Sequence, residues 1–252
     1  MKANVLILDI ETSPIVAFVW GLKDQNIALN QIHKDSSVMS WAAKWLGAKP
    51  VMYEDRRNDV NDKRILTKLW KLLDKADIVL TQNGQRFDIP KVNARFIAYG
   101  MPPPSPFRHI DTYQIVKRVA AFTSNKLEYL TKTLCAKHVK TSHTKFPGMT
   151  LWDECLKGNK KSWDEMRHYN IKDVLSTEEL YERIKAWAPE TMAKAFEGSN
   201  PTLNCLTCGH DRLTKRGYMR TKKSLVQRYQ CQQCGAWQKG ESIKPKKIVG
   251  GI

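Results

Sequence analysis

The sequence lacks any long apolar run. After Met1 and Lys2 the only apolar run near the N-terminus is about six residues long and ends in an acidic motif, which is too short for the core of a signal peptide. Nothing approaches the ~20 apolar residues of a membrane-spanning helix. These absences argue against an integral membrane or exported protein, and we expect a soluble, cytoplasmic protein with no membrane partner.

Acidic side chains are scarce relative to basic ones. The 252 residues carry 42 Lys and Arg against 25 Asp and Glu, giving a formal net charge of +17. Residues 199–252 hold eleven of the basic residues and only two acids, a net of +9, while the first 198 residues have a net of +8. A charge excess concentrated in this way favours a polyanionic partner, and nucleic acid is the one that we expect.

Cysteines are also few, and most of them are paired in sequence. Cys135 and Cys155 are isolated, whereas the other four form the C-x-x-C pairs Cys205–Cys208 and Cys231–Cys234, with 22 residues between the pairs. In a reducing compartment this spacing indicates a metal site rather than disulfides. Four thiolates can hold one tetrahedral Zn²⁺ with no open position, and we therefore expect a structural zinc ion.

The segment around these cysteines resembles a zinc ribbon, similar to those of transposases and transcription-related proteins. Two stretches between the pairs, 213–217 and 224–230, have the length of short strands, and a basic turn joins them. Arg220, Lys222 and Lys223 of this turn are candidate contacts to nucleic acid. A bound metal also explains how so small a segment could fold with few large apolar side chains.

Four carboxylates stand in contexts that suit two divalent cations. Asp9 and Glu11 follow the apolar run 5–10, which predicts a buried strand, and residues two apart on a strand share a face. Asp88 stands in the segment NGQRFD, and Asp173 lies four residues after Tyr169 in a segment with helical character. Hydrolysis of a phosphodiester by two metal ions requires such concentrated negative charge.

These contexts resemble the three motifs of the DEDD superfamily of 3′ to 5′ exonucleases, which includes the proofreading domains of DNA polymerases. Asp9-Ile10-Glu11 resembles the first motif, residues 83–88 the second, and residues 169–173 the tyrosine form of the third. The resemblance covers about residues 1–188. It implies a ribonuclease H-like α/β fold, with a mixed sheet flanked by helices, followed here by the small zinc ribbon.

The resemblance also implies roles for these residues. Asp9 bridges two Mg²⁺ or Mn²⁺ ions, Glu11 and Asp173 complete the site of the ion that activates water, and Asp88 supports the second ion. Products would be nucleoside 5′-monophosphates. The resemblance places Phe87 near the terminal nucleotide, and Asn83 of the same motif is a further candidate for substrate binding.

The third motif admits two interpretations. His168 lies five residues before Asp173, the offset used by the histidine branch, and could act as a general base. Tyr169 lies four residues before Asp173, the offset of the tyrosine branch, and with an ordinary pKa of ~10 it would orient the water instead. We favour Tyr169, because Asn170 stands where the histidine branch has a small residue.

Hydrophobic patterns predict the order of elements in the first domain. The expected strands are 5–10, 38–45, 51–53 and 78–81, and the expected helices are 62–74, 90–99, 127–134 and 172–187. Asp111 is either a second acid behind the site or a helix N-cap. The polar stretch 137–145 either lines a substrate groove or forms a solvated loop.

We therefore expect an exonuclease domain over residues 1–188, a linker over 189–202, a zinc ribbon over 203–240 and a basic tail over 241–252. The expected activity is metal-dependent 3′ to 5′ exonuclease hydrolysis, on DNA in preference to RNA. The ribbon is a candidate for binding a replication or repair protein. Two alternatives remain: a structure-selective ribonuclease H-like endonuclease, and a non-catalytic protein that binds nucleic acid through its ribbon.

Overall fold

The computed structural model describes residues 3–140, 145–189, 204–221 and 224–243. The chain forms two compact units. The larger comprises Asn4–Gln114 and Thr123–Leu180, and the smaller contains the C-terminal part from Tyr181 together with Ile115–Phe122 and the first three residues. Within the described ranges, no helix has the length and apolar character needed to cross a membrane.

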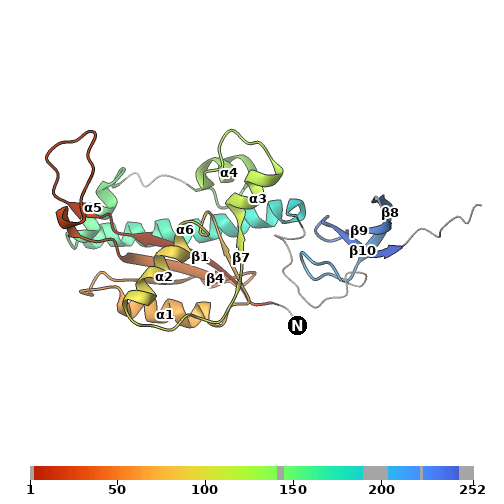
Figure 1. Cartoon of the computed structure of the whole chain (residues 1–252), viewed down its shortest axis with the longest axis horizontal. Helices are drawn as coiled ribbons and strands as arrows, with labels where there is room; N and C mark the ends of the chain where they lie inside the picture. The colour runs from red at the N-terminus through yellow and green to blue at the C-terminus, as the bar shows by residue number, and fades with distance from the viewer. Residues whose placement is uncertain (1–2, 141–144, 190–203, 222–223, 244–252) are drawn as a thin grey trace, which may run out of the picture. The chain divides into compact units, whose positions relative to one another are not determined.

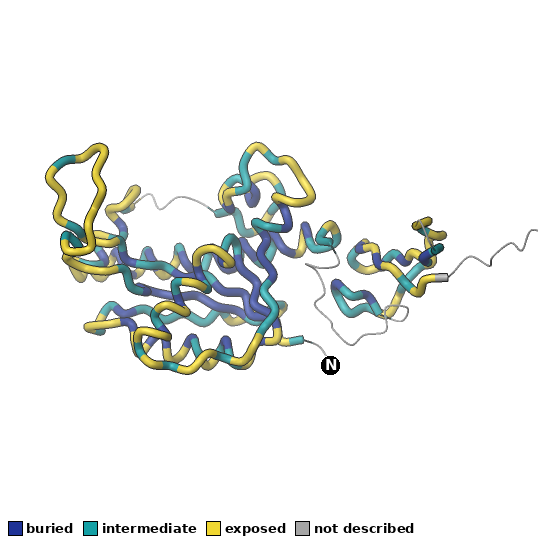
Figure 2. Tube along the Cα trace, viewed as in Figure 1, coloured by how far each residue is buried: buried dark blue, intermediate teal, exposed yellow. Residues whose placement is uncertain are grey.

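The larger unit is built on a mixed five-stranded sheet with the strand order β5-β4-β1-β6-β7. Strand β1 pairs with β4 in antiparallel and with β6 in parallel orientation, while β5 extends the antiparallel side and β7 the parallel side. Figure 2 shows these strands as the buried centre of the unit. The bounds are β1 Val5–Thr12, β4 Val38–Trp45, β5 Met52–Asp55, β6 Ile78–Thr81 and β7 Arg108–Asp111. This architecture confirms the predicted mixed α/β fold.

Helices cover both faces of the sheet (Figure 1). On one face, α1 (Lys63–Leu73) and α2 (Asp88–Ala98) share a buried apolar cluster with the strands. On the other face, α5 (Thr150–Leu156) and the 25-residue helix α6 (Lys160–Ile184) pack against the sheet. Lys44 of β4 forms an ion pair with Glu178 of α6 across this second face.

Alternation along β1 determines which side chains reach α6. Leu6, Leu8 and Ile10 belong to the apolar cluster under α1 and α2. Because successive side chains of a strand point to opposite faces, Asp9 and Glu11 lie on the face that α6 covers. Their antiparallel partners on β4 are Ala42 and Ser40. The central strand is therefore buried on both sides and presents its two acids to one helix.

Several elements have the limits that the sequence predicts. Strands β4 and β6 and helix α4 (Leu127–Leu134) begin and end where the hydrophobic patterns predict. Helix α2 starts at Asp88 rather than after it, because Pro90 lies inside the first turn, where no backbone N–H is needed. Helix α6 starts twelve residues before the predicted position, since Asn159 caps it by accepting the N–H of Lys161 at 3.0 Å.

Other elements were not predicted. In the larger unit these are the short strands β2 (Val16–Ala17) and β3 (Ile32–Lys34), the 3₁₀ turn Leu29–Gln31 and helix α5. Helix α3 (Thr112–Val119), which follows β7, was expected only under the interpretation of Asp111 as a helix N-cap. The predicted helix 172–187 ends in a 3₁₀ turn, Lys185–Trp187, after α6.

In the smaller unit, three antiparallel strands form a sheet in the order β10-β9-β8. Strands β8 (Leu213–Arg220) and β9 (Leu225–Cys231) correspond to the two predicted strands, and β10 (Trp237–Ile243) is an addition. Lys222, Lys223, residues 190–202 of the expected linker, Leu203 of the expected ribbon and residues 244–252 of the expected tail lie outside the described residues.

Candidate active site

Asp9, Glu11 and Asp173 come together although they are far apart in the sequence. The first two stand on β1 and the third on α6, and a carboxylate oxygen of each lies within 4.8 Å of the others. Tyr169 lies one helical turn before Asp173, as the sequence spacing predicts. The local fold thus gathers three of the four predicted acids at one spot.

Asp88 borders this cluster. It is the first residue of α2, it is buried, and its Oδ1 accepts the backbone N–H of Ile10 at 3.0 Å. Ile10 stands between Asp9 and Glu11, so this hydrogen bond ties the second motif directly to the first. The negative charge of Asp88 also raises the pKa of Asp9.

The crowding of these acids changes their protonation. Burial raises the pKa of Asp9 well above its ordinary 3.8, and repulsion from Asp173 and Asp88 adds to the effect. Burial, followed by repulsion from Asp173, raises the pKa of Glu11 to about 8. Burial raises the pKa of Asp88 to about 7, against the opposing hydrogen bond from Ile10. Near neutral pH the cluster therefore holds its full negative charge only when cations compensate it.

Lys140 supplies one such cation. Its Nζ donates to Oδ2 of Asp173 at 2.5 Å and lies 4.6 Å from the centre of the Tyr169 ring. Burial by itself would lower the pKa of Lys140, but Asp173, Tyr169 and Asp9 together raise it above the ordinary value. The sequence pattern left the stretch around Lys140 undecided between a groove and a solvated loop, and the structure places this lysine at the carboxylates.

The two candidates of the third motif occupy different environments. Tyr169 is partly buried, and its ring packs edge-on against that of Trp152, with 6.2 Å between the ring centres. Burial raises the pKa of Tyr169 to about 12, with Lys140 opposing and Asp173 adding to the increase. His168 is exposed, and its Nδ1 contacts the carbonyl oxygen of Asp164 at 2.7 Å. Of the two, Tyr169 is the residue that contacts Lys140.

Asn170 fixes the orientation of Asp9. Its Nδ2 donates to Oδ2 of Asp9 at 2.5 Å and to the carbonyl oxygen of the same residue at 3.2 Å. Its Oδ1 accepts the hydroxyl of Ser40 at 3.1 Å, so the amide is held from both ends. Asn170 is fully buried between α6 and the sheet. In the sequence, Asn170 served only to disfavour the histidine interpretation, and no local pattern indicates this contact with Asp9.

Comparison with known proteins agrees with this architecture. A family model for the RNase_H superfamily matches residues 6–185. The chain belongs to the RNase_H superfamily. A family B DNA polymerase from the hyperthermophilic archaeon Pyrobaculum calidifontis has a similar structure, with a TM-score of 0.55 and 14% identity over 88% of this chain. The match covers 31% of the polymerase chain. No curated protein sequence matches the chain.

Membership of the RNase_H superfamily supports a nuclease type of function, with divalent metal ions at the acidic cluster. At 14% identity the similarity to the polymerase concerns the fold alone. The carboxylate donors fit hard divalent cations, which take oxygen ligands. The raised pKa values of Asp9 and Glu11 show that ionising both acids is unfavourable without added positive charge.

In this RNase_H superfamily member a tight turn presents the second motif. Asn83 has a φ of +66°, and Asp111 braces the turn by accepting the N–H groups of Asn83 and Gln85 at 2.8 and 3.1 Å. A Cβ on Gly84 would lie 2.4 Å from Oγ1 of Thr81, so only glycine fits there. Phe87, next to Asp88, is 39% exposed.

Asp111 combines both roles that the sequence left open. Besides bracing the turn, its Oδ1 accepts the N–H of Tyr113 at 2.9 Å, which is the capping interaction expected at the start of α3. Asp111 is buried beside Asp88 and is among the groups that raise the pKa of Asp88.

The four paired cysteines form a second cluster, in the smaller unit. Their sulfur atoms lie within 4.8 Å of one another, with 3.7 Å separating Cys205 from Cys234 and Cys208 from Cys231. Sulfurs ~2.3 Å from a central tetrahedral ion would be separated by about 3.8 Å, so the cluster has the size of a four-thiolate metal site. Gly209 and Gly235, which follow the pairs, both have a φ of +76°.

The candidate substrate contacts of the ribbon are only partly described. Arg220 ends β8 and is exposed, and Thr221 closes the turn by donating its N–H to the carbonyl oxygen of Ser224 at 2.8 Å. Lys222 and Lys223 fall outside the described residues.

Proposed function

We propose that this protein is a metal-dependent 3′ to 5′ exonuclease that hydrolyses terminal phosphodiesters of DNA, in preference to RNA, to nucleoside 5′-monophosphates. The observation that carries the proposal is the cluster of Asp9, Glu11 and Asp173, with Asp88 bound to the backbone between the first two. Membership of the RNase_H superfamily supports phosphodiester hydrolysis as the reaction.

Two Mg²⁺ or Mn²⁺ ions would be held by Asp9, Glu11, Asp88 and Asp173. When bound, such ions supply positive charge to the attacking and leaving oxygens of an in-line displacement. Asn170 holds Asp9 in place, because its amide donates to one carboxylate oxygen of Asp9 and is itself held by Ser40.

Tyr169 is proposed to orient the attacking water. With a pKa of about 12 its phenol stays protonated at neutral pH, so it can donate a hydrogen bond or accept one but cannot serve as the base. The outward contact of His168 with Asp164 argues against His168 as that base. The tyrosine form of the third motif is therefore the interpretation that we propose.

Asn83 and Phe87 are proposed to contact the terminal nucleotide. The left-handed turn at Asn83 is braced by Asp111, so its position is fixed, and the partly exposed ring of Phe87 stands one residue before Asp88. We also propose the division into an exonuclease domain (1–188), a linker (189–202), a ribbon (203–240) held by one structural Zn²⁺, and a basic tail (241–252).

The test is digestion of 3′-labelled and 5′-labelled DNA and RNA, single-stranded and duplex, with Mg²⁺ or Mn²⁺. We expect release of mononucleotides from the 3′ end and loss of at least 100-fold activity in Asp9→Asn and Asp88→Asn. Asp164→Asn is the matched control, because Asp164 is an exposed acid on the same helix as Asp173. Internal cuts would replace this proposal with an endonuclease, and binding without any cleavage would leave a nucleic-acid-binding protein.

A further inference from the structure

The three-stranded sheet of the ribbon has one covered and one open face. Tyr229 of β9 and Gln238 of β10 are opposite each other in the register and are 8% and 4% exposed. The Gln238 side chain accepts the N–H of Leu206 and donates to the carbonyl oxygen of Asn204, both at 2.9 Å. The segment that carries the first cysteine pair therefore covers this face.

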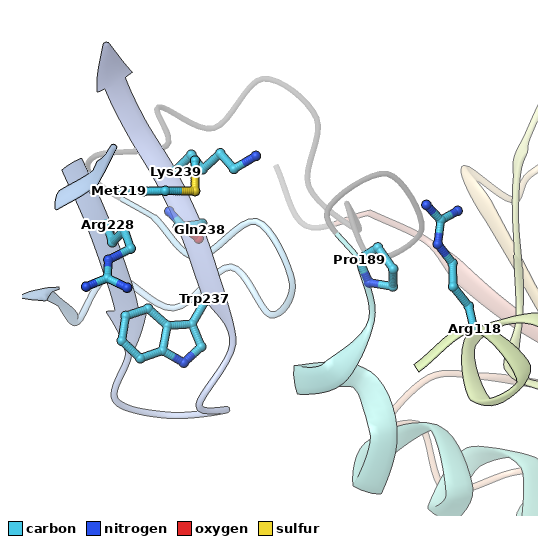
Figure 3. A pocket seen from close by; sticks show the side chains of 7 residues that line it. All are labelled: Arg118, Pro189, Met219, Arg228, Trp237, Gln238 and Lys239. Atoms are coloured by element: carbon cyan, nitrogen blue, oxygen red, sulfur yellow. The ribbon is translucent and has the colours of Figure 1, made fainter. Parts of the chain in front are cut away.

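The opposite face carries an exposed aromatic ring with cations beside it. Because side chains alternate along a strand, Arg228, Lys239 and Trp237 project from the face opposite to Tyr229 and Gln238, and Arg228 is paired with Lys239 in the register. Trp237 is 49% exposed, and the guanidinium carbon of Arg228 lies 5.6 Å from the centre of its ring. Figure 3 shows the two side chains next to each other on the ribbon strands, with Met219 and Lys239 nearby.

The charge around this ring is strongly positive. The three strands carry five basic side chains against the single acid Glu241, namely Lys215, Arg216, Arg220, Arg228 and Lys239. An exposed indole held by an arginine offers a flat surface for stacking, and the neighbouring cations attract phosphates. The bases of a single strand can stack on such a ring, whereas those of a duplex are already stacked on each other.

We propose that the Trp237–Arg228 face of the ribbon binds single-stranded nucleic acid, with a base stacked on Trp237 and the backbone phosphates against Arg228 and Lys239. This surface is distinct from the carboxylate cluster and from the basic turn at Arg220. Its binding does not depend on the proposed cleavage, so it can be measured in a full-length protein that carries Asp9→Asn.

The experiment measures the affinity of that protein for fluorescein-labelled oligothymidylate and for a duplex of equal length, over a series of salt concentrations. We expect Trp237→Ala to weaken binding to the single strand by about tenfold or more, and Trp237→Phe to retain most of the affinity. Arg228→Gln should lower the slope of log affinity against log salt by about 0.7. Tighter binding of the single strand than of the duplex is also expected.

Two matched controls separate stacking from general effects. Trp187→Ala removes an exposed tryptophan outside the ribbon, and Lys71→Gln removes an equal charge from an exposed lysine of α1. Retention of one zinc ion per chain shows that each variant is folded. Unchanged affinity in Trp237→Ala, an equal loss in Trp187→Ala, or duplex bound as tightly as single strand would overturn the proposal. Any of these results would leave the exonuclease proposal untouched, because cleavage is tested separately.

Discussion

Glu11→Gln is expected to stabilise the protein when Mg²⁺ and Mn²⁺ are absent, and only at higher pH. Folding raises the pKa of Glu11 from 4.5 to about 8, through burial and repulsion from Asp173. The folded state therefore binds this proton more tightly than the unfolded state does. The stabilising contribution is complete below about pH 4.5 and is lost as the pH rises through about 8.

The size of the stabilisation by Glu11→Gln follows from the difference between the two pKa values of Glu11, 4.5 in the unfolded state and about 8 in the folded state. A rise of about 3.5 pKa units corresponds to about 5 kcal/mol of charging cost well above pH 8. Because Glu11, Asp9 and Asp88 titrate as a group, a single substitution relieves only part of the repulsion, and we expect an increase of about 2 kcal/mol in the free energy of unfolding. At about pH 5 the carboxyl is already protonated in the folded state, so the increase should be close to zero.

Urea unfolding of zinc-loaded protein at about pH 5 and about pH 8.5 tests this reasoning. Glu128→Gln, an exposed acid on α4, is the matched control and should change little at either pH. Adding Mn²⁺ at the higher pH should stabilise the parent more than Glu11→Gln, since the variant has lost a ligand. Equal destabilisation of Glu11→Gln at both pH values would show that packing, rather than charge crowding, dominates at this position.

Three further outcomes are expected. Lys140→Gln should bind Mn²⁺ about three- to tenfold more tightly in calorimetry, because the lysine ammonium competes with the metal for Asp173; weaker binding would mean that Lys140 orders the site instead. Asn170→Ala should lower kcat/KM for mononucleotide release by about tenfold or more through loss of its hydrogen bond to Asp9, and unaltered kinetics would remove its positioning role. Gly84→Ala should lower the free energy of unfolding by about 1–3 kcal/mol in urea titrations, since its Cβ would collide with Thr81; an unchanged value would contradict that clash.

Local sequence patterns were sufficient to predict the elements whose structure depends mainly on their own residues. The apolar runs of β4 and β6 and the periodicity of α4 give their observed limits, because burial is continuous along them. The start of α6 was missed because its first three turns are rich in charged and polar residues, and the capping by Asn159 outweighs that weak pattern. Strand β10 was missed because it contains Gly240, next to an irregularity in its pairing with β9.

The same distinction applies to the candidate site, because its carboxylates could be predicted from the local sequence and its tertiary contacts could not. Asp9, Glu11, Asp88 and Asp173 stand in short contexts whose strand or helix character can be predicted locally, and the structure brings three of them within 4.8 Å with the fourth alongside. Their roles in metal binding and catalysis remain predictions.

Lys140 and Asn170 were not predicted as members of the site, although both contact its carboxylates. Asn170 reaches Asp9 because α6 packs on β1, and Lys140 reaches Asp173 from a polar stretch with no periodicity of its own. Such contacts depend on tertiary packing, which a local pattern does not contain.

In the ribbon, the metal cluster could be predicted from the sequence, but the surface around Trp237 could not. The cysteine spacing predicts the metal cluster because the ligands and their glycines form a local unit, and both glycines have the left-handed conformation that the turns require. Trp237 had no assigned role in the sequence, because only the pairing of β10 with β9 places it beside Arg228. A surface that depends on the third strand could therefore be recognised only after the sheet was known.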